Sequence, residues 1–448
     1  MRILLFCELF PPLTYGGGET LFWNLAKSLV SRSHEVYVIT QKVRGERKSE
    51  VRAGVHILRV GKPVEYSGAL TTNALESLAY LVGAFVTGIR VASQKRVEII
   101  HSNTYVPAVV GQMCASILRK KHVMTVHDVY LAAMPWFRAK WRTQANVGFL
   151  ARILGPFLEL ALLRMPATVI HTVSDSSSRD LLQMGIKTRI TVIPNSIDIG
   201  DYLTEGEVSV NHHQAIYVGR LVFYKNLEVI FRAFVNVLEA VSDAKLVVVG
   251  DGPMRKTWES MTNDLGLKGH VRFFGKIPHK DKVRLLKESA FLILPSMVEG
   301  FGIVILEAFA CEKPVLASSI AALRELVSDG TDGFLADPTD EQEWAKKMTT
   351  LFTNSENTRQ MGRAGIAKLV ANYSNERVVE GMENLYKHIS TPGSGAGSFV
   401  IKPNMPGVVF QVAFNDALKQ RIHKLKFPFG NGHASARVSA LVEETVMR

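Results

Sequence analysis

Cysteine is scarce in this sequence of 448 residues, which contains only Cys7, Cys114 and Cys311. An odd number of cysteines without a Cys-x-x-Cys pair predicts neither a disulfide framework nor a zinc site. The scarcity favours a reducing compartment, and we expect a cytoplasmic protein.

Long apolar runs are also lacking. The two longest, residues 78–89 and 147–163, are interrupted by glycine, proline or charged residues, so neither is expected to span a bilayer. The run from Ile3 to Phe6 is too short for the apolar part of a signal peptide, and it is predicted to be a first strand.

Acidic residues are fewer than basic ones, which gives a formal net charge of +12. This charge favours an acidic partner, namely nucleic acid, anionic lipid head groups or phosphorylated small molecules, without choosing among them. Hydrophobic residues make up 47% and charged residues 21% of the chain, which is an ordinary globular balance. At this length we expect two domains.

Short apolar strand patterns alternate with helical patterns, and the alternation restarts after Pro194-Asn195-Ser196. Such alternation predicts an α/β fold in which helices cover parallel sheets, here in two Rossmann-like domains. Helices are predicted from the spacing of apolar residues at 21–29, 225–240 and 375–389. The expected strands cover residues 3–6, 35–39, 55–59, 99–101, 122–126 and 168–173 in the first domain, and 215–218, 245–249, 271–274, 291–294 and 314–317 in the second.

We therefore place a first domain at 1–198 and a second at 199–374. A final helix at 375–390 is expected to return to the first domain. Residues 391–448 begin with a Gly/Ser-rich linker and continue as a tail of unknown structure.

The segment Glu299 to Glu307, of sequence EGFGIVILE, follows the expected strand 291–294 and leads into a helix. Glu307 lies among apolar neighbours, and because an unpaired buried carboxylate is costly, it needs partners such as the hydroxyls of a ribose. The alternative is a plain strand-loop-helix connection with an exposed Glu299 and a salt-bridged Glu307.

Backbone groups of the same segment suit an anion. Gly300 and Gly302 allow a ligand to come close, and the N–H groups of Phe301, Gly302 and Ile303 at the helix start would point at a diphosphate.

Two cations follow the expected strand 215–218 within one loop, at Arg220 and Lys225. A guanidinium fork and an ammonium point charge are suited to neutralising a diphosphate leaving group. The alternative is that both are solvated loop residues.

Two glycine-rich turns accompany these motifs, Gly16-Gly17-Gly18 and Gly250-Asp251-Gly252-Pro253. Neither completes the Gly-x-Gly-x-x-Gly fingerprint of dinucleotide-binding proteins, because Leu21 and Arg255 occupy the third glycine position. A plain turn is the alternative for the second.

His127-Asp128 follows the expected strand 122–126, so the imidazole of His127 should lie at the carboxyl edge of a parallel sheet, where such folds bind ligands. His127 is our candidate for a group that faces the reacting part of a bound ligand, and a purely structural histidine is the alternative.

Together these residues resemble the retaining glycosyltransferases of the GT-B architecture, in the large family four that includes sucrose-phosphate synthases and phosphatidylinositol mannosyltransferases. The resemblance covers about Met1 to Ile389. It rests on motifs in the family's order: residues 11–19, His127-Asp128, Val173-Ser174, Ile193 to Asp198, Gly219-Arg220 with Lys225-Asn226, Gly250 to Pro253 and Glu299 to Glu307. Ser196 stands where the family often has glycine, which leaves the assignment intact.

The resemblance implies a donor site in the cleft between two facing domains. Arg220 and Lys225 would bind the diphosphate, Glu307 the ribose, Glu299 the sugar hydroxyls, and His127 the transferred sugar. The remaining donor-binding residues would be Gly17, Gly18, Asp251, Gly252, Lys276, Ile277, Phe301, Gly302 and Ile303, of which Lys276 and Ile277 would lie near the base.

The implied reaction is transfer of a sugar from a UDP- or GDP-sugar to a glycan or lipid-linked acceptor, with retention of anomeric configuration. The chain has no Asp-x-Asp motif. Cationic side chains would therefore take the place of a divalent ion, and neither a metal nor another cofactor is expected.

The segment 134–142 interleaves aromatic and basic residues, as segments at membrane surfaces do. It predicts a peripheral contact with the cytoplasmic face of a membrane, and a partly buried helix with a basic outer face is the alternative. The rival functions are a sugar-nucleotide epimerase, a nicotinamide-dependent oxidoreductase and a noncatalytic sugar-nucleotide-binding protein. Nucleic-acid binding ranks last because the chain contains no recognisable module for it.

Overall fold

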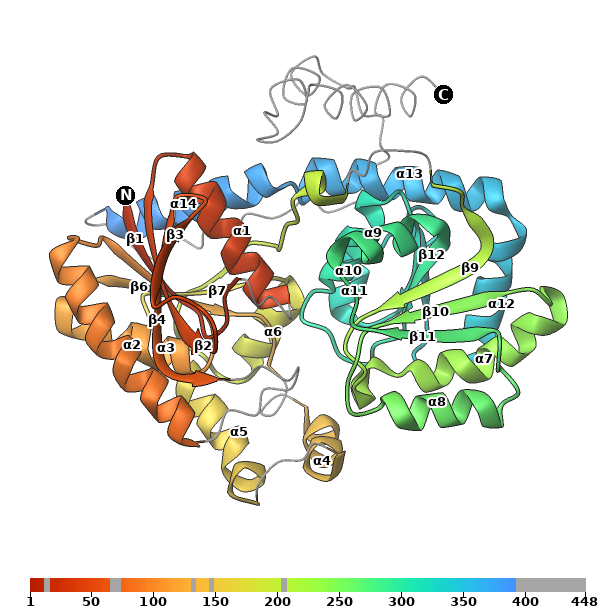
Figure 1. Ribbon diagram of the computed structural model, residues 1–448, viewed down its shortest axis with the longest axis horizontal. Helices are drawn as coiled ribbons and strands as arrows, with labels where there is room; N and C mark the ends of the chain where they lie inside the picture. Colours follow the sequence, from red (N-terminus) through yellow and green to blue (C-terminus); the bar gives the residue numbers. More distant parts are fainter. Residues whose placement is uncertain (12–16, 65–73, 130–133, 145–148, 203–207, 392–448) are drawn as a thin grey trace, which may run out of the picture.

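The computed structural model describes residues 1–11, 17–64, 74–129, 134–144, 149–202 and 208–391. They form two α/β domains that lie side by side, with α13 (Ser355–Asn372) and α14 (Asn375–Ser390) running along one side of both (Figure 1). The predicted α/β fold with parallel sheets is confirmed.

The first domain contains an eight-stranded sheet in the order β3-β4-β2-β1-β5-β6-β7-β8. All neighbouring strands are parallel except β3 and β4. The strands are β1 (Arg2–Phe6), β2 (Glu35–Val43), β3 (Ser49–Arg52), β4 (Val55–Val64), β5 (Ile99–Ser102), β6 (Lys121–Val126), β7 (Val169–Thr172) and β8 (Ile190–Val192).

Helices cover both faces of this sheet because successive side chains of each strand point to opposite sides. Ile3 and Leu5 of β1 pack with α1 (Gly17–Ser31) and α14, whereas Leu4 and Phe6 pack with α2 (Ala74–Gln94) and α3 (Val106–Leu118). Next to α3, α5 (Phe149–Leu163) and α6 (Asp175–Gln183) pack on β6 and β7.

The second domain contains a six-stranded parallel sheet in the order β11-β10-β9-β12-β13-β14. Counted from its own first strand this order is 3-2-1-4-5-6, the doubly wound arrangement of dinucleotide-binding folds. The strands are β9 (Asn211–Val218), β10 (Lys245–Val249), β11 (Val271–Gly275), β12 (Ser289–Leu294), β13 (Val315–Ser318) and β14 (Gly333–Ala336).

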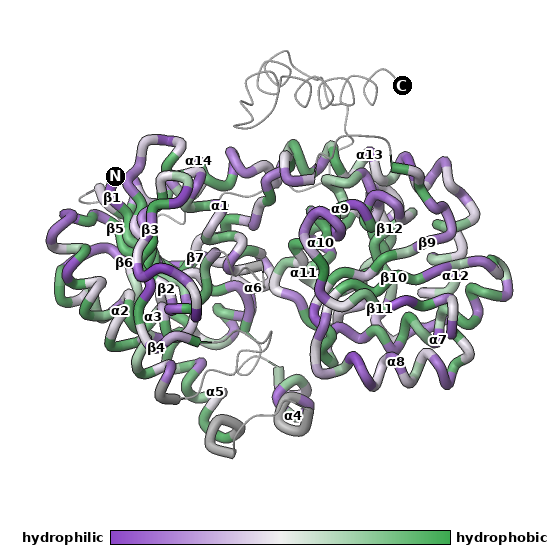
Figure 2. The backbone as a smooth tube through the Cα atoms, viewed as in Figure 1, coloured by the Kyte–Doolittle hydropathy of each residue, from purple (hydrophilic) through white to green (hydrophobic). Residues whose placement is uncertain are grey.

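One continuous core fills the second domain, with Trp258 and Trp344 fully buried in it. Figure 2 shows the same distribution, since hydrophobic stretches coincide with the central strands. The helices around it are α7 (Leu227–Ala240), α8 (Arg255–Asp264), α9 (His279–Glu288), α10 (Ile303–Ala310), α11 (Ala321–Leu326), α12 (Glu341–Thr353) and α13.

The chain passes between the domains twice. The outgoing passage follows β8, the returning one precedes α14, and the two are joined by a parallel bridge between Ile197 and Ser374. After this bridge α14 places Val379, Leu385 and Tyr386 in the core of the first domain. That core is therefore built from two distant parts of the sequence.

Every predicted strand is present, and three further short strands occur at β3, β8 and β14. The helix predicted over 225–240 begins at Leu227, because residues 223–225 form a 3-10 turn. Asn226 follows that turn with a φ of 53°, a left-handed conformation that separates the turn from the helix. Among the described residues, no helix is both long and apolar enough to cross a membrane.

Candidate active site

The predicted cations and carboxylate of the second domain meet at the carboxyl edge of its sheet. Arg220 and Lys225 follow β9 and Glu299 follows β12, and these are the neighbouring strands at which the strand order reverses. Lys225 Nζ donates to Glu299 Oε1, and the Ser296 hydroxyl donates to the same oxygen at 2.9 Å. Both charged side chains are mostly buried, with exposed fractions of 14% for Lys225 and 11% for Glu299. The alternative in which Glu299 is an exposed residue of a plain strand-loop-helix connection is therefore wrong.

Two tyrosines hold the cations in place. Arg220 Nη2 donates to the Tyr224 hydroxyl at 2.9 Å, and the Lys225 ammonium lies 5.6 Å from the centroid of the Tyr224 ring. The buried Tyr217 hydroxyl donates to the Arg220 carbonyl at 3.0 Å. Burial, and then the Glu299 charge, hold the pKa of Tyr217 well above its usual value, so Tyr217 stays a neutral donor.

The turn Gly250-Asp251-Gly252 supports the Arg220 loop from the side. A Cβ at Gly250 would lie 1.9 Å from the Gly219 carbonyl oxygen, and one at Gly252 would lie 2.4 Å from that of Leu221. Leu221 N–H also donates to the Asp251 carbonyl at 3.0 Å. Both glycines are thus needed for close backbone approach between two loops, a role that the sequence did not predict.

The other donor-binding candidates of the second domain lie at the same edge. The Asp251 carboxylate accepts from the Gly252 N–H at 2.7 Å, and Lys276 and Ile277 follow β11 directly. Gly302, at a φ of 91°, is the N-cap of α10, and Phe301 is buried beside it. Ile303 is the first residue of that helix. The predicted assignment of these residues to a donor stays a prediction.

Glu307 is held by two residues that sequence reasoning missed. Its Oε1 accepts from the Tyr202 hydroxyl at 2.8 Å, and Lys282 Nζ lies 2.8 and 2.9 Å from the two carboxylate oxygens. The salt-bridged alternative for Glu307 is thus present in the structure. A role in binding ribose is compatible with this ion pair and stays a prediction.

On the first domain, Gly17 begins α1 and Gly18 lies in its first turn, whereas Gly16 falls outside the described residues. A Cβ at Gly18 would come within 3.1 Å of His127 Nε2 and 3.4 Å of Asn103 Nδ2. The ends of β5 and β6 and the start of α1 therefore meet at one point. Asn103, which directly follows β5, is a further residue of this site that sequence reasoning missed.

The imidazole of His127 is uncharged at neutral pH. Burial in the first place, and then the neighbouring His171, lower the pKa of His127 to about 3. Its Nε2 atom is buried and has no hydrogen-bond partner among the described residues. A neutral ring with an unused nitrogen can give or accept a single hydrogen bond to a ligand.

The two domains touch next to these groups. A Cβ at Gly300 would lie 2.2 Å from the His127 carbonyl oxygen, and the Ser177 hydroxyl donates to that oxygen at 3.1 Å. Farther along the boundary, the Glu325 carboxylate of α11 accepts from the N–H groups of Asp175 and Ser176 at 2.9 and 2.7 Å. A residue of one domain therefore caps a helix of the other.

The aromatic and basic segment 134–142 mostly forms α4 (Pro135–Gln144), which also lies at the domain boundary. Phe137 is buried against Tyr224 and Val298 of the second domain, and its ring centroid is 5.4 Å from that of Tyr224. Trp136 is 39% exposed. Part of this segment thus packs beside the loop that carries Arg220 and Lys225, as expected for the alternative of a partly buried helix.

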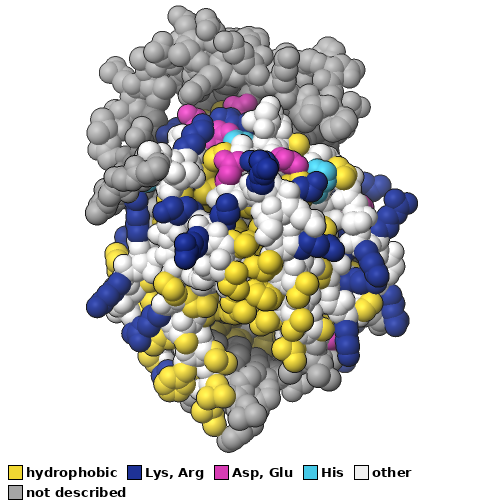
Figure 3. All heavy atoms as spheres, turned by 90° about the vertical axis from the view of Figure 1, so that its left-hand side faces the viewer, with side chains coloured by type: hydrophobic (Ala, Val, Ile, Leu, Met, Phe, Trp, Pro, Cys, Tyr) yellow, Lys and Arg dark blue, Asp and Glu magenta, His cyan; other side chains and the backbone are white. Residues whose placement is uncertain are grey.

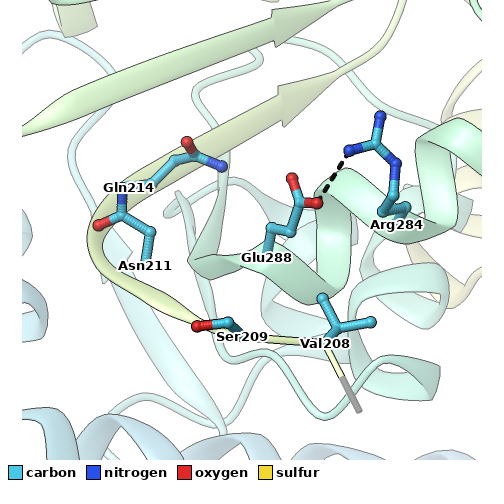
Figure 4. A pocket seen from close by; sticks show the side chains of 6 residues that line it. All are labelled: Val208, Ser209, Asn211, Gln214, Arg284 and Glu288. Carbon is cyan, nitrogen blue, oxygen red and sulfur yellow. Dashed lines mark hydrogen bonds and ion pairs between the residues drawn. The ribbon is translucent and has the colours of Figure 1, made fainter. Parts of the chain in front are cut away.

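A hollow of about 440 Å³ lies elsewhere on the second domain, at the amino end of β9 (Figure 4). It is lined by Val208, Ser209, Asn211, Gln214, Arg284 and Glu288, and Arg284 pairs with Glu288 at 2.9 Å. None of the predicted site residues lines it. Open parallel sheets bind ligands at the carboxyl ends of their strands, so we assign the site to that edge.

All three cysteines are free and buried. Among the described residues, no group of three His, Cys, Asp or Glu side chains is placed to hold a metal ion. Whether the reaction needs a metal stays a prediction from the sequence.

Comparison with known proteins matches both domains to families. Residues 205–368 match the family "Glycosyl transferases group 1", and residues 15–201 match "Glycosyltransferase Family 4". The D-inositol 3-phosphate glycosyltransferase of Corynebacterium efficiens is 25% identical over 404 residues, which is 85% of this chain and 92% of the relative. An uncharacterised glycosyltransferase of Methanocaldococcus jannaschii is 25% identical over 336 residues, 73% of this chain and 87% of the relative.

Solved structures show the same fold at lower identity. Sucrose-phosphate synthase from Thermosynechococcus elongatus superposes with a TM-score of 0.70 at 20% identity, covering 87% of this chain and 98% of that one. HepE of Anabaena in complex with UDP and glucose gives a TM-score of 0.65 at 21% identity, covering 86% and 99%. With both domains matched in sequence and the whole fold matched in space, the chain belongs to the group 1 glycosyltransferases and has the GT-B fold.

Proposed function

We propose that this glycosyltransferase moves a sugar from a UDP- or GDP-sugar to a glycan or lipid-linked acceptor, with retention of anomeric configuration. The observation that carries the proposal is the meeting of Arg220, Lys225 and Glu299 at the strand-order reversal of the second sheet. HepE, a similar structure, is described in complex with UDP-glucose, which supports a nucleotide-sugar donor here.

In this proposal the two cations act on the leaving group. Breaking the bond between the anomeric carbon and the phosphate develops negative charge on the diphosphate, and preorganised cations favour that transition state. Tyr217 and Tyr224 hold the Arg220 loop before the donor arrives, so little reorganisation is needed. The backbone N–H groups at the start of α10 and the Gly17-Gly18 turn of α1 would complete the phosphate site.

The remaining groups would orient the donor. Glu299, already held by Lys225 and Ser296, would accept from sugar hydroxyls. Lys282 and Tyr202 would hold the Glu307 carboxylate toward the ribose. From the opposite domain, the neutral His127 would bond to the transferred sugar through its unused Nε2. Domain closure would bring these groups together around the donor.

Thermal-shift binding against UDP-, GDP- and ADP-sugars tests the donor site, because a ligand that binds the native state raises its apparent stability. A stabilising donor whose effect is lost in both Arg220→Ala and Glu307→Ala would support the assignment. Arg284→Ala is the matched control, because Arg284 lines the hollow at the opposite edge of the same sheet. Loss of the shift in Arg284→Ala alone would move the nucleotide to that hollow and overturn the proposal.

Retention needs its own test once a donor is known. The anomeric proton of the first product formed, followed by NMR, reports whether the configuration of the donor is kept. An inverted first product would refute this part of the proposal while leaving the donor site intact. A product that forms without any acceptor and differs from the donor only in sugar configuration would favour the epimerase.

A further inference from the structure

The first domain exposes an unusual number of large apolar side chains on neighbouring helices. On α2 they recur every fourth residue, which places them on one stripe of the helix. Phe157 and Leu158 of α5 are 69% and 63% exposed, and Ile117 of α3 is 61% exposed. We call this set the apolar face; it consists of Leu78, Val82, Val86, Ile117, Ile153, Leu154, Phe157 and Leu158.

The three helices form one continuous surface. α2 and α3 contact each other and share a core cluster, and α3 and α5 share the next cluster through Ala108 and Leu163. The opposite side of the sheet is covered by α1 and α14. Figure 3 looks onto the first domain and shows hydrophobic side chains gathered over its lower part, with Lys and Arg above and beside them.

Charge on and just beside these helices is mostly positive. Residues 77–97, 105–121 and 153–167 contain one acidic residue, Glu159, which is 5% exposed. The basic residues of these ranges lie in the last two turns of each helix or just after it; they are Arg90, Lys95, Arg96, Arg119, Lys120, Lys121 and Arg164. Glu76, in the first turn of α2, and Glu98, whose side chain is 44% exposed and pairs with Arg2, lie just outside these ranges. The surface therefore presents apolar side chains beside a border in which basic residues outnumber acidic ones.

The arrangement has a direction. Crossover helices run opposite to the parallel strands, so the first turns of α2 and α5 lie near the carboxyl edge of the sheet, which faces the site. Leu78, Ile153 and Leu154 lie in those first halves, whereas the basic border lies at the other end. Val86, Ile117, Phe157 and Leu158 lie in the second halves of their helices, so the apolar face extends from the edge that faces the site to the basic border.

We infer that the apolar face docks onto the surface of an anionic lipid bilayer. Apolar side chains of amphipathic helices insert at the boundary between head groups and acyl chains, while basic residues bind anionic head groups. Exposed Trp136 on α4 adds a side chain suited to this boundary. The inference deepens the lipid-linked acceptor of the proposed function, on which it rests for its purpose, and places the membrane contact mainly on α2, α3 and α5.

Charge argues against the other occupants of this face. A two-fold dimer through the same surface would bring the same excess of basic residues from each copy into one interface. Residues 392–448 contain more Lys and Arg than Asp and Glu, so they offer no complementary charge either. An anionic bilayer is the partner that complements both the apolar residues and the basic border.

Co-flotation of the full chain with vesicles tests the inference. We expect binding to vesicles of equal parts phosphatidylcholine and phosphatidylglycerol, weaker binding to phosphatidylcholine alone, and loss of binding as salt screens the charges. Phe157→Glu and Arg90→Glu should each lower the partition coefficient at least about tenfold, since one basic charge near an anionic surface contributes roughly fivefold. Val51→Glu is the matched control, because Val51 is 62% exposed on the edge strand β3.

Because each substituted residue is exposed, folding is checked by circular dichroism and should be unchanged. No binding of the unaltered chain to anionic vesicles, or binding that Phe157→Glu and Arg90→Glu retain, would overturn the inference. Self-association that Phe157→Glu abolishes, without vesicle binding, would assign the face to a second copy and also overturn it. Vesicle binding is measured without a nucleotide sugar, so a failed donor assay leaves this result independent.

Discussion

Removal of the Lys282 ammonium tests how much the ion pair between Lys282 and Glu307 contributes to the stability of the second domain. Lys282 lies outside the Glu299 to Glu307 motif. Lys282→Met keeps the length of the side chain and removes its charge, which leaves the Glu307 carboxylate with the Tyr202 hydroxyl. Side-chain exposures are 19% for Lys282 and 12% for Glu307, so water can replace little of the lost interaction.

The expected loss in the free energy of unfolding lies between two limits. At the 2.8 Å separation of Lys282 Nζ and Glu307 Oε1 and an effective dielectric constant of about 20, the gross attraction is roughly 6 kcal/mol. Desolvation opposes most of it: exposed pairs contribute about 0–1 kcal/mol, and breaking a buried pair costs about 3–5 kcal/mol. We therefore expect Lys282→Met to lower the free energy of unfolding of the second domain by about 2 kcal/mol.

A double-mutant cycle with Glu307→Gln isolates the pair. The single change Glu307→Gln should cost about 1 kcal/mol, and the double variant about 2 kcal/mol, which gives a coupling of about 1 kcal/mol. Urea unfolding followed by tryptophan fluorescence measures it, since Trp258 and Trp344 are buried in this domain. Lys280→Met on the exposed side of α9 is the control. The reasoning would be refuted if the two single substitutions lowered the free energy of unfolding additively. It would also be refuted if Lys282→Met lowered it no more than Lys280→Met does.

Three further predictions concern the domain boundary, the glycine turn and a buried histidine. Glu325→Ala leaves two N–H groups of α6 without their acceptor, so we expect the domains to separate more readily and small-angle scattering to show a larger radius of gyration; an unchanged radius would contradict this. Gly250→Ala, whose Cβ would overlap a carbonyl oxygen, should cost roughly 2–4 kcal/mol in urea unfolding, against about 1 kcal/mol for Gly269→Ala, which meets nothing within 4 Å. Burial lowers the pKa of His122 to about 4, so its ring stays neutral in the folded chain while the unfolded chain takes up a proton below about pH 6.5. Stability should therefore fall as pH drops from about 6.5 to 4, by at most about 1.4 kcal/mol per pH unit from this residue, and His122→Asn should flatten that slope in urea titrations at successive pH values.

The fold could be predicted from sequence wherever a strand is buried on both faces. Such strands are continuous apolar runs, as in Leu246 to Val249, and they stand out from the helical spacing around them. β3 escaped prediction because it is an exposed edge strand of sequence SEVR, and β8 because it has only three residues. β14 begins at Gly333, which interrupts any apolar pattern.

In the candidate site too, some features could be predicted from the sequence and others depend on tertiary packing. Lys225 and Glu299 could be predicted to lie at one edge because each follows a strand of a parallel sheet, although their direct ion pair could not. Lys282 gave no signal, since it is one of several cations on an ordinary amphipathic helix, and only the packing of α9 beside α10 brings it to Glu307. The position of His127 directly after β6 was predicted from the sequence, whereas its neutrality depends on burial and on His171, which comes from a different strand.

The position of α14 has a consequence for how the chain folds during synthesis. The core of the first domain needs Val379, Leu385 and Tyr386, which leave the ribosome only after the entire second domain has been made. Domains generally fold as units as they emerge, so the second domain can be complete while the first still exposes an unfilled groove beside α1. The domain that is translated first is therefore finished last, and a nascent chain stalled before α14 would present that groove to chaperones.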